Sequence, residues 1–371
     1  MPPKRSFPTV PVLALAASGV VALACAPRGA RSTPRASGLP ASPGDDWPSV
    51  VVLEQADLFP ETLVASPDGE GFLVGSMREG RVLEVARDGS VSPLVDDPRL
   101  CSVLGMAIDP DRGWIWVVSA DAGVSTRPSA GGARALAVVA AYDASTGASM
   151  RYVDLAPLFP GPHLPNGIAL GPDGTAYVTD SFAPVIYRVG PDGDAEVFVR
   201  DPRFEGEGVH LNGLVVHPDG YLLVVDKTRG ALYRVPIENP TRVSEVTLDA
   251  PLPGADGLML VGERDLVVVA NRVPAAATDA AVVLRSTDGF AAAGEIGRVD
   301  LGSVYPTTSA LRGNRVYAIH SQLDVLLGSA GRAVGPWSEI ATIVEIGRVD
   351  DRHARVASLA LPVADERRSG P

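Results

Sequence analysis

Cysteine is almost absent from this 371-residue chain, which contains only Cys25 and Cys101. If Cys25 is lipidated or removed with a leader segment, Cys101 has no partner, so we expect no disulfide within the folded domain. Two cysteines are also too few for a cysteine-based metal site. The next shortage is of positive charge: 32 Lys and Arg stand against 44 Asp and Glu, a formal net charge of −12. Nucleic-acid binding depends on neutralising phosphates with basic side chains, so we expect no nucleic-acid partner.

Two motifs of common catalytic sites are missing as well. The sequence contains no Gly-x-Ser-x-Gly elbow, which places the nucleophile in many serine hydrolases. It also contains no glycine-rich loop of the kind that cradles phosphates. Ser-His-Asp catalysis and nucleotide chemistry therefore have no support in the sequence.

Residues that interrupt helices are abundant. The chain has 39 Gly and 33 Pro, about one residue in five, against roughly one in eight in average proteins. Both residues are unfavourable inside helices, which argues against a mostly helical protein. Because 46% of the residues are apolar, the chain can bury a large core, which argues against disorder.

The first 25 residues have the pattern of an export signal. Lys4 and Arg5 precede an apolar run over residues 10–24. This run of about 15 residues is shorter than the roughly 20 that span a bilayer. Small residues directly before Cys25 resemble the cleavage box of bacterial lipoproteins, in which the cysteine is acylated. We predict Cys25 as a lipidation site; the alternatives are an ordinary secreted or periplasmic protein and an uncleaved anchor.

Composition divides the remainder of the chain into three parts. Residues 26–46 are rich in Pro, Ala, Ser and Gly without apolar periodicity, which predicts a flexible tether. Residues 47–364 carry the alternating apolar pattern of one folded domain. Residues 365–371 are polar, and we predict a disordered tail.

One pattern recurs through the folded domain: an apolar strand, a turn resembling Pro-Asp-Gly, and a second apolar strand. The six turns begin at Pro67, Pro110, Pro172, Pro218, Gly262 and Arg312, at intervals of 43, 62, 46, 44 and 50 residues. Asp-Gly between apolar runs is a strong hairpin signal, and several units contain a second hairpin. Four strands in about 45 residues are typical of a β-propeller blade. We therefore predict an all-β, six-bladed β-propeller with four-stranded antiparallel blades.

Two further features refine this architecture. The longest interval predicts an insertion in the second unit, over residues 121–136. The segment 50–53 precedes the first unit, and the segments 341–344 and 355–361 follow the last turn. We expect these segments to pair and close the ring, which removes free sheet edges.

The position six residues before each turn start is of special interest, and we name these six positions the inner ring. In chain order they hold Glu61, Leu104, Asn166, Asn212, Asp256 and Pro306. Equivalent positions on successive blades lie at equal depth around the channel, so the four oxygen-bearing side chains should converge. Two carboxylates close together in a buried site require a compensating cation. Carboxylate and amide oxygens favour Ca²⁺, or alternatively Mg²⁺ or Mn²⁺, and the lack of His or Cys here disfavours zinc.

Taken singly, each of these residues has a simpler interpretation. Asn-Gly and Asp-Gly pairs are usually turns, and Glu61 following Phe-Pro could be a solvated side chain. The shared offset in four repeats is what favours a metal site with Glu61, Asn166, Asn212 and Asp256 as ligands.

The same segments resemble a known family. The sequences LPNGIALGPDGTAYVTDS, HLNGLVVHPDGYLLVVDK and PGADGLMLVGERDLVVVAN, with FPETLVASPDG upstream, are similar to gluconolactonases and regucalcin (senescence marker protein), and more distantly to paraoxonases and strictosidine synthase-like proteins. The resemblance covers residues 58–325. It implies a six-bladed propeller with a divalent metal, commonly Ca²⁺, in its channel, and hydrolysis of lactones or related esters. It also implies that Asp256 is both a metal ligand and the candidate general base.

The sequence departs from the family pattern at three positions. The first-blade motif, usually Glu-Gly-Pro, is Glu61-Thr62-Leu63 here. Gly257 stands where paraoxonase-like members have a second Asn ligand, and Leu104 lies near the position of their catalytic His. A histidine-based mechanism is therefore not carried over, and the substrate stays undefined.

A second set of polar residues is expected near the same mouth of the channel, as second-shell partners of the ligands or as contacts to substrate. These residues are Asp180, Asp226, Asn271, His320, His163 and His210. Capping of strand ends and solvated loop histidines are the alternatives.

Two functions follow from these observations. The first is a metal-dependent hydrolase of a lactone or ester, exported to the bacterial envelope or periplasm, acting on a small molecule as a monomer and touching the membrane only through its lipid anchor. The second is a non-catalytic propeller with a structural metal that binds a ligand or protein at the cell envelope, since one fold supports many functions.

Overall fold

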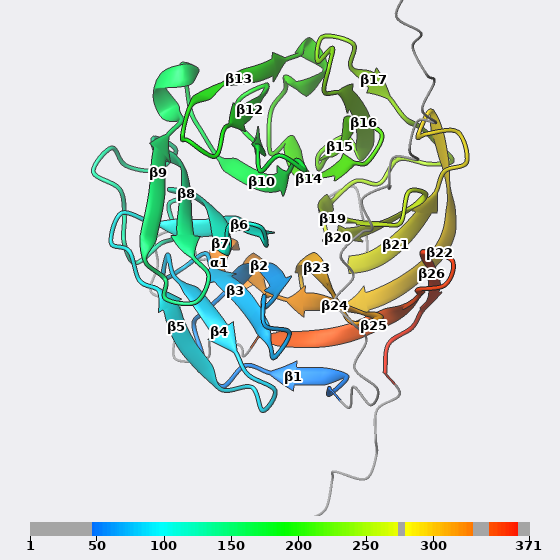
Figure 1. Cartoon of the computed structure of the whole chain (residues 1–371), viewed down its shortest axis with the longest axis horizontal. Coiled ribbons are helices and arrows are strands. Elements are labelled where there is room, and N and C mark those ends of the chain that lie inside the picture. The colour runs from blue at the N-terminus through cyan, green and yellow to red at the C-terminus, as the bar shows by residue number, and fades with distance from the viewer. Residues whose placement is uncertain (1–46, 274–278, 329–340, 363–371) are drawn as a thin grey trace, which may run out of the picture. The chain divides into compact units, whose positions relative to one another are not determined.

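The computed structural model describes residues 47–273, 279–328 and 341–362. The predicted signal segment with Cys25, the tether and the C-terminal tail lie outside the described residues. Six sheets are arranged as blades around one axis (Figure 1), which confirms the predicted all-β, six-bladed propeller. Within the described ranges, no helix is long and apolar enough to cross a membrane.

The first four sheets each contain four antiparallel strands, in the order in which they occur in the chain. Blade one consists of β2 (Pro60–Ala65), β3 (Phe72–Ser76), β4 (Val82–Val85) and β5 (Val91–Val95). Blade two consists of β6 (Ser102–Asp109), β7 (Trp114–Ala120), β8 (Ala137–Asp143) and β9 (Ser149–Asp154). Blade three consists of β10 (Pro165–Leu170), β11 (Ala176–Asp180), β12 (Val185–Val189) and β13 (Ala195–Arg200). Blade four consists of β14 (Leu211–His217), β15 (Tyr221–Asp226), β16 (Ala231–Pro236) and β17 (Ser244–Glu245).

The last two blades each gain a fifth strand. Blade five consists of β19 (Ala255–Val261), β20 (Asp265–Ala270), β21 (Asp279–Arg285) and β22 (Ala292–Gly302), with the short β18 (Thr247–Leu248) parallel to β22. Blade six consists of β23 (Pro306–Arg312), β24 (Arg315–His320) and β25 (Thr342–Asp350), with both β1 (Val50–Val52) and β26 (Arg355–Leu359) on its outer edge. The described helices are the single turns η1 (Ala156–Leu158) and η2 (Pro202–Phe204) and the short α1 (Leu323–Gly328).

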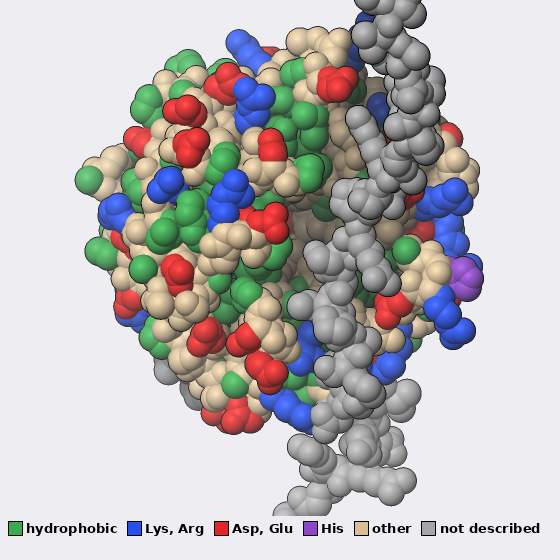
Figure 2. All heavy atoms as spheres, in the orientation of Figure 1, with side chains coloured by type: hydrophobic (Ala, Val, Ile, Leu, Met, Phe, Trp, Pro, Cys, Tyr) green, Lys and Arg blue, Asp and Glu red, His purple; other side chains and the backbone are tan. Residues whose placement is uncertain are grey.

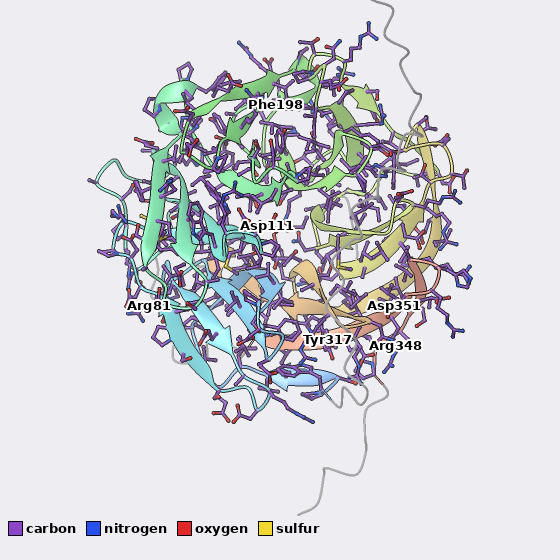
Figure 3. All side chains as sticks on the ribbon, in the orientation of Figure 1. Arg81, Asp111, Phe198, Tyr317, Arg348 and Asp351 are labelled. Atoms are coloured by element: carbon purple, nitrogen blue, oxygen red, sulfur yellow. The ribbon has the colours of Figure 1, made fainter. Side chains whose placement is uncertain are left out.

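The ring closes as the sequence predicts. The first half of β25 pairs with β1 from the start of the domain, and its second half pairs with β26 from the end. Tyr317, labelled in Figure 3, packs edge-on against Phe72 of blade one and donates a hydrogen bond to the Pro48 carbonyl oxygen. The two ends of the domain therefore stabilise the same blade.

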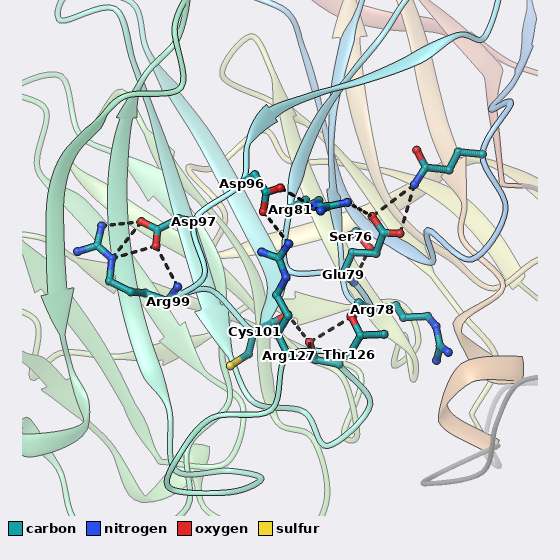
Figure 4. Close-up of polar contacts among 12 residues, drawn as sticks. Ser76, Arg78, Glu79, Arg81, Asp96, Asp97, Arg99, Cys101, Thr126 and Arg127 are labelled. Carbon is teal, nitrogen blue, oxygen red and sulfur yellow. Dashed lines mark hydrogen bonds and ion pairs between the residues drawn. The ribbon is translucent and has the colours of Figure 1, made fainter.

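The insertion in blade two is also present, as the strandless connection between β7 and β8. Its residue Arg127 pairs with Asp96, which also pairs with Arg81 of blade one (Figure 4). Ser125 Oγ donates to the Cys101 carbonyl oxygen at 2.6 Å. These contacts tie the insertion to the side of the ring where blades one and two meet.

Charge on the propeller surface is mixed. Figure 2 shows acidic and basic side chains interspersed over the face toward the viewer. Many are paired locally, as in the contact of Arg188 with Glu196 at 2.5 Å. Acidic side chains therefore form no single large negative patch on this face.

Every innermost strand contains a β-bulge at the same place. The pairing register shifts at or beside the inner-ring position in β2, β6, β10, β14, β19 and β23. A bulge re-aims a side chain that regular pairing would direct along the sheet normal. The Asn-Gly and Asp-Gly pairs of the inner ring therefore belong to strands, and the turn interpretation of these pairs is wrong.

Glycine follows the inner-ring residue in blades two to five because neighbouring blades approach closely there. A Cβ atom on Gly105 would lie 2.2 Å from the Asn166 carbonyl oxygen, and one on Gly213 would lie 2.2 Å from the Asp256 carbonyl oxygen. Each bulge thus packs its backbone onto the next, which fixes the spacing of the ring.

We expect Gly105→Ala to destabilise the protein by about 3 kcal/mol, since the added methyl group forces two blades apart. Gly297→Ala is the matched control. Gly297 also lies in a strand, β22, but a Cβ atom added there would have no neighbouring atom within 4 Å. Urea unfolding of both variants measures the difference. Equal midpoints for the two variants would contradict the close-packing explanation.

Candidate functional site

Five of the six inner-ring residues line one cavity of about 160 Å³ in the central channel. Its walls include Glu61, Asn166, Asn212 and Asp256, together with Leu104 from blade two. Blade six contributes Thr307, Thr308 and Ser309, whereas Pro306 is not among the lining residues. The four predicted ligands are 7%, 6%, 3% and 2% exposed, in chain order. The structure therefore brings the four oxygen-bearing side chains together in a buried site.

Glu61 is held in this site without full compensation. Its Oε2 atom is buried and has no hydrogen-bond partner among the described residues. Burial raises the pKa of Glu61 well above its ordinary value, the Asp256 carboxylate raises it further, and Lys227 opposes both effects. Glu61 Oε2 is therefore a buried acceptor that the described protein groups leave unpaired.

Asp256 has two hydrogen-bond partners, Lys227 and Asn271. The sequence analysis did not predict Lys227, and it named Asn271 without assigning its contact. Lys227 Nζ lies 2.5 Å from Asp256 Oδ2, and Asn271 Nδ2 donates to the same oxygen. Asn271 also donates to the Pro306 carbonyl oxygen at 3.1 Å, while its own Oδ1 has no partner among the described residues. Asp256 Oδ2 therefore accepts bonds from blades four and five, and Asn271 continues the contact to blade six; Oδ1 accepts none of these bonds.

Lys227 is a buried ammonium group at the ring. Burial alone would lower the pKa of Lys227, but the Asp256 carboxylate, Tyr305 and Glu61 together raise it above its ordinary value. Its Nζ also lies 5.5 Å from the centre of the Tyr305 ring. Lys227 therefore stays charged next to two carboxylates.

The two asparagines are fixed by blade three. Asn166 Nδ2 donates to Ser181 Oγ at 3.2 Å, which leaves its amide oxygen to face another group. Thr179 Oγ1 donates to the backbone oxygen of Asn212 at 2.6 Å. These bonds position the strand at the bulge and orient one amide.

Four of the six other predicted polar residues form two separate pairs. Asp180 accepts hydrogen bonds from His163 Nδ1 at 2.8 Å and from the backbone of Leu164, and Asp226 pairs with His210 Nδ1 at 2.9 Å. Both aspartates are fully buried, and their side-chain contacts are with His163, Tyr187, His210 and Arg229 rather than with the inner ring. These contacts fit the capping interpretation better than a place beside the ligands.

His320 lies at the end of β24, also in a buried position. Burial lowers its pKa to about 4, against a smaller opposing effect from Asp279. Its Nε2 atom has no hydrogen-bond partner within the described ranges. His320 is therefore neutral, and of the six additional residues only Asn271 hydrogen-bonds a predicted ligand.

Alternation along the strand explains why Lys227 was missed. Asp180 and Asp226 end their strands, and successive side chains of a strand point to opposite faces. Ser181, Lys227 and Asn271 follow their strand ends by one residue, and each hydrogen-bonds an inner-ring side chain. The predicted set contains Asn271 in blade five, but in blades three and four it contains the residue before the one that hydrogen-bonds the inner ring. A consistent count of nine residues beyond each turn start finds all three.

The His163–Asp180 pair makes stability depend on pH. The hydrogen bond to Asp180 raises the pKa of His163, more than burial lowers it. The pair's contribution is therefore complete below the unfolded-state pKa of about 6.5 and is lost as the pH rises through the higher folded-state value. We expect Asp180→Asn to flatten the decline of melting temperature over this interval. If melting temperature falls with pH as steeply in the variant as in wild type, the pH dependence comes from other groups.

An apolar cluster packs beside the inner ring. Its buried members come from blades one, two and three and from α1: Phe59, Met77, Leu104, Ala120, Leu164, Leu323 and Leu326. Phe59 and Tyr305 both adopt positive φ, at 42° and 49°, which is strained for bulky residues. The strain lies directly before the inner-ring strands of blades one and six. The surroundings of the ring are thus apolar on this side.

The ring fits a hard divalent cation by donor chemistry. Two carboxylates and two amides can supply oxygen ligands, and Glu61 Oε2 is a buried acceptor with no partner among the described residues. No group of three or more His, Cys, Asp or Glu side chains in the described part of the chain could hold a metal ion, so a cation here would need the two amides as well. Lys227 adds one positive charge that a metal site does not need.

Comparisons with known proteins agree with the fold. No protein-family model matches the sequence, and no curated protein matches it. Similar solved structures include the major allergen Mala s 1 of Malassezia sympodialis (16% identity, 80% of this chain and 96% of that chain, TM-score 0.60). Regucalcin of Agrobacterium tumefaciens, described as a calcium-binding protein, covers 85% of this chain and 97% of its own at 16% identity and a TM-score of 0.55. A protein named provisionally as a gluconolactonase matches 80% of this chain and 92% of its own length, at 18% identity and a TM-score of 0.52.

The neighbours thus include propellers of the group that the sequence resembles. At identities of 16–18% they establish the fold. What the channel of this chain binds has to be argued from its own residues.

Proposed function

We propose that this chain is a metal-dependent hydrolase of a lactone or related ester, with a divalent cation, best suited to be Ca²⁺, in the central channel. The observation that carries the proposal is the convergence of Glu61, Asn166, Asn212 and Asp256 in one buried cavity, with Glu61 Oε2 left without a partner. Burying such a carboxylate is unfavourable unless a charge compensates it. The resemblance to gluconolactonases and the calcium-binding description of one structural neighbour support the same site.

Each residue has a defined part in this proposal. Glu61, Asn166, Asn212 and Asp256 would hold the cation, which when bound supplies Lewis-acid polarisation of an ester carbonyl. Asp256 would also orient and deprotonate the attacking water through Oδ1, since the bonds from Lys227 and Asn271 go to Oδ2. The buried, neutral His320 is not needed for this proton transfer.

The cavity walls guide the choice of substrate class. The cavity of about 160 Å³ combines the four oxygen-bearing side chains with apolar residues such as Leu104 and Met106. An ester or lactone that places its carbonyl group at the oxygen-bearing side chains and an apolar substituent against these apolar residues suits both kinds of wall.

The test is turnover by the calcium-loaded protein on sugar lactones, acyl lactones and aryl esters, with and without EDTA. We expect hydrolysis of at least one acyl or aryl substrate and its loss in EDTA. If no substrate is hydrolysed, the second function applies: a non-catalytic propeller whose metal is structural and which binds a ligand or protein.

The location and partners are proposals from the sequence. We propose export to the bacterial envelope with a lipid anchor on Cys25, a small-molecule substrate, no nucleic-acid partner and a monomeric state. Incorporation of labelled palmitate by wild type and not by Cys25→Ser tests the anchor. Release of unlabelled protein into the periplasm would contradict it.

A further inference from the structure

Lys227 is a charged residue at the proposed cation site that the four proposed ligands do not include. It projects from the end of β15 in blade four onto Asp256 of blade five, with Nζ 2.5 Å from Oδ2. The residue is 9% exposed and Asp256 is 2% exposed. This is a buried ion pair between two blades, and its acidic member is a proposed ligand.

The backbone of Lys227 is held on both sides. Its N–H donates to the His210 carbonyl oxygen at 2.9 Å, and its own carbonyl oxygen accepts from the Gly254 N–H at 2.7 Å. Gly254 has a φ of 85°, and its carbonyl oxygen accepts from the Asn271 N–H at 3.0 Å. The backbone of the segment that carries Lys227 is thus held between blades four and five.

The charge of the ring changes when Lys227 is counted. Glu61 and Asp256 contribute two negative charges, and Lys227 returns one positive charge beside them. Because a nearby cation repels Ca²⁺, and Oδ2 already accepts bonds from Lys227 and Asn271, the ring is a weaker cation site than its four oxygen ligands suggest. The same ammonium lets Asp256 be buried when no metal is bound.

We propose that Lys227 is an internal counter-ion of Asp256 that competes with the divalent cation for the channel site. The inference rests on the proposed function, since it concerns the same cation. Lys227 acts through Asp256 and is therefore a positioning residue. Its competition sets the calcium concentration at which the site fills, and it keeps the propeller folded below that concentration.

Calorimetric titration of metal-free protein with Ca²⁺ tests this proposal. Lys227→Gln removes the charge while keeping a hydrogen-bond donor, and Lys227→Arg keeps the charge. We expect Lys227→Gln to bind Ca²⁺ about 10- to 100-fold more tightly than wild type, the range by which contacts to metal ligands alter affinity. Lys227→Arg should bind no more tightly than wild type.

Melting curves give a second readout that is independent of activity. In EDTA, Lys227→Gln should melt below wild type, because Glu61 and Asp256 then have no compensating charge, and Ca²⁺ should restore it. If Lys227→Gln does not fold in EDTA, the calorimetric titration of Lys227→Arg is the deciding measurement. Tighter calcium binding by Lys227→Arg than by wild type would overturn the proposal.

The two possible failures look different. Equal calcium affinity in wild type and Lys227→Gln overturns the role of Lys227 while leaving the metal site in place. Calcium binding by none of the three proteins overturns both this inference and the metal of the proposed function.

Discussion

Asp256→Asn should lower kcat/KM for the best substrate of the panel by about 10³-fold, within the range for removal of a general base. The amide keeps the size of the side chain but cannot take a proton from water, and it contributes one ligand oxygen instead of two. KM should change much less than kcat, because the lost interaction is with the attacking water rather than with the substrate.

The control for this prediction is Asp111→Asn. Asp111 is an exposed residue in the turn between β6 and β7, and its loss should leave kcat/KM within about two-fold, as for surface substitutions away from a site. Full activity in Asp256→Asn would remove Asp256 from the mechanism. Equal loss in both variants would indicate a general effect on folding.

Glu61→Gln should change stability in opposite directions with and without calcium. Wild type in Ca²⁺ at 100 times its dissociation constant should gain about 2.7 kcal/mol from ligand binding, and the variant should lose most of this gain. In EDTA the variant should melt above wild type, because burial raises the pKa of Glu61 and so makes its ionised form unfavourable in the folded state. Differential scanning calorimetry in both conditions measures the two effects.

The opposite signs make this prediction specific to the channel. A merely structural role for Glu61 would lower the melting temperature in both conditions. Glu84 is exposed on β4, so Glu84→Gln is the matched control, and it should leave both curves unchanged.

The repeat pattern predicted the architecture because turns leave strong local signals. Gly69 and Gly220, each in an inter-strand turn of its unit, have φ angles of 76° and 80°, which few residues other than glycine adopt. Equal spacing of such turns determines the blades, and one position per blade then determines the inner ring. The ring closure by β1 and β25 could be predicted from the same reasoning, since free edges are unfavourable.

The side chains around the ring were harder to predict. Lys227 has a charged, flexible side chain, and its neighbour Asp226 was the more obvious candidate at a strand end. Successive side chains point to opposite faces of a strand, so Lys227 rather than Asp226 meets Asp256, and the shared offset becomes visible only when Ser181, Lys227 and Asn271 are compared across three blades. Likewise, the pairing of His163 with Asp180 joins residues 17 positions apart, and no local pattern distinguishes that capping role from a role at the site.

The most direct measurement of the central claim is anomalous diffraction from crystals of the wild-type protein soaked in Ca²⁺ or in Mn²⁺ as its substitute. We predict one cation peak in the central channel, within ligand distance of Glu61, Asn166, Asn212 and Asp256, with Lys227 drawn away from Asp256. A channel without a peak at saturating metal, with Lys227 still bonded to Asp256, would contradict the account.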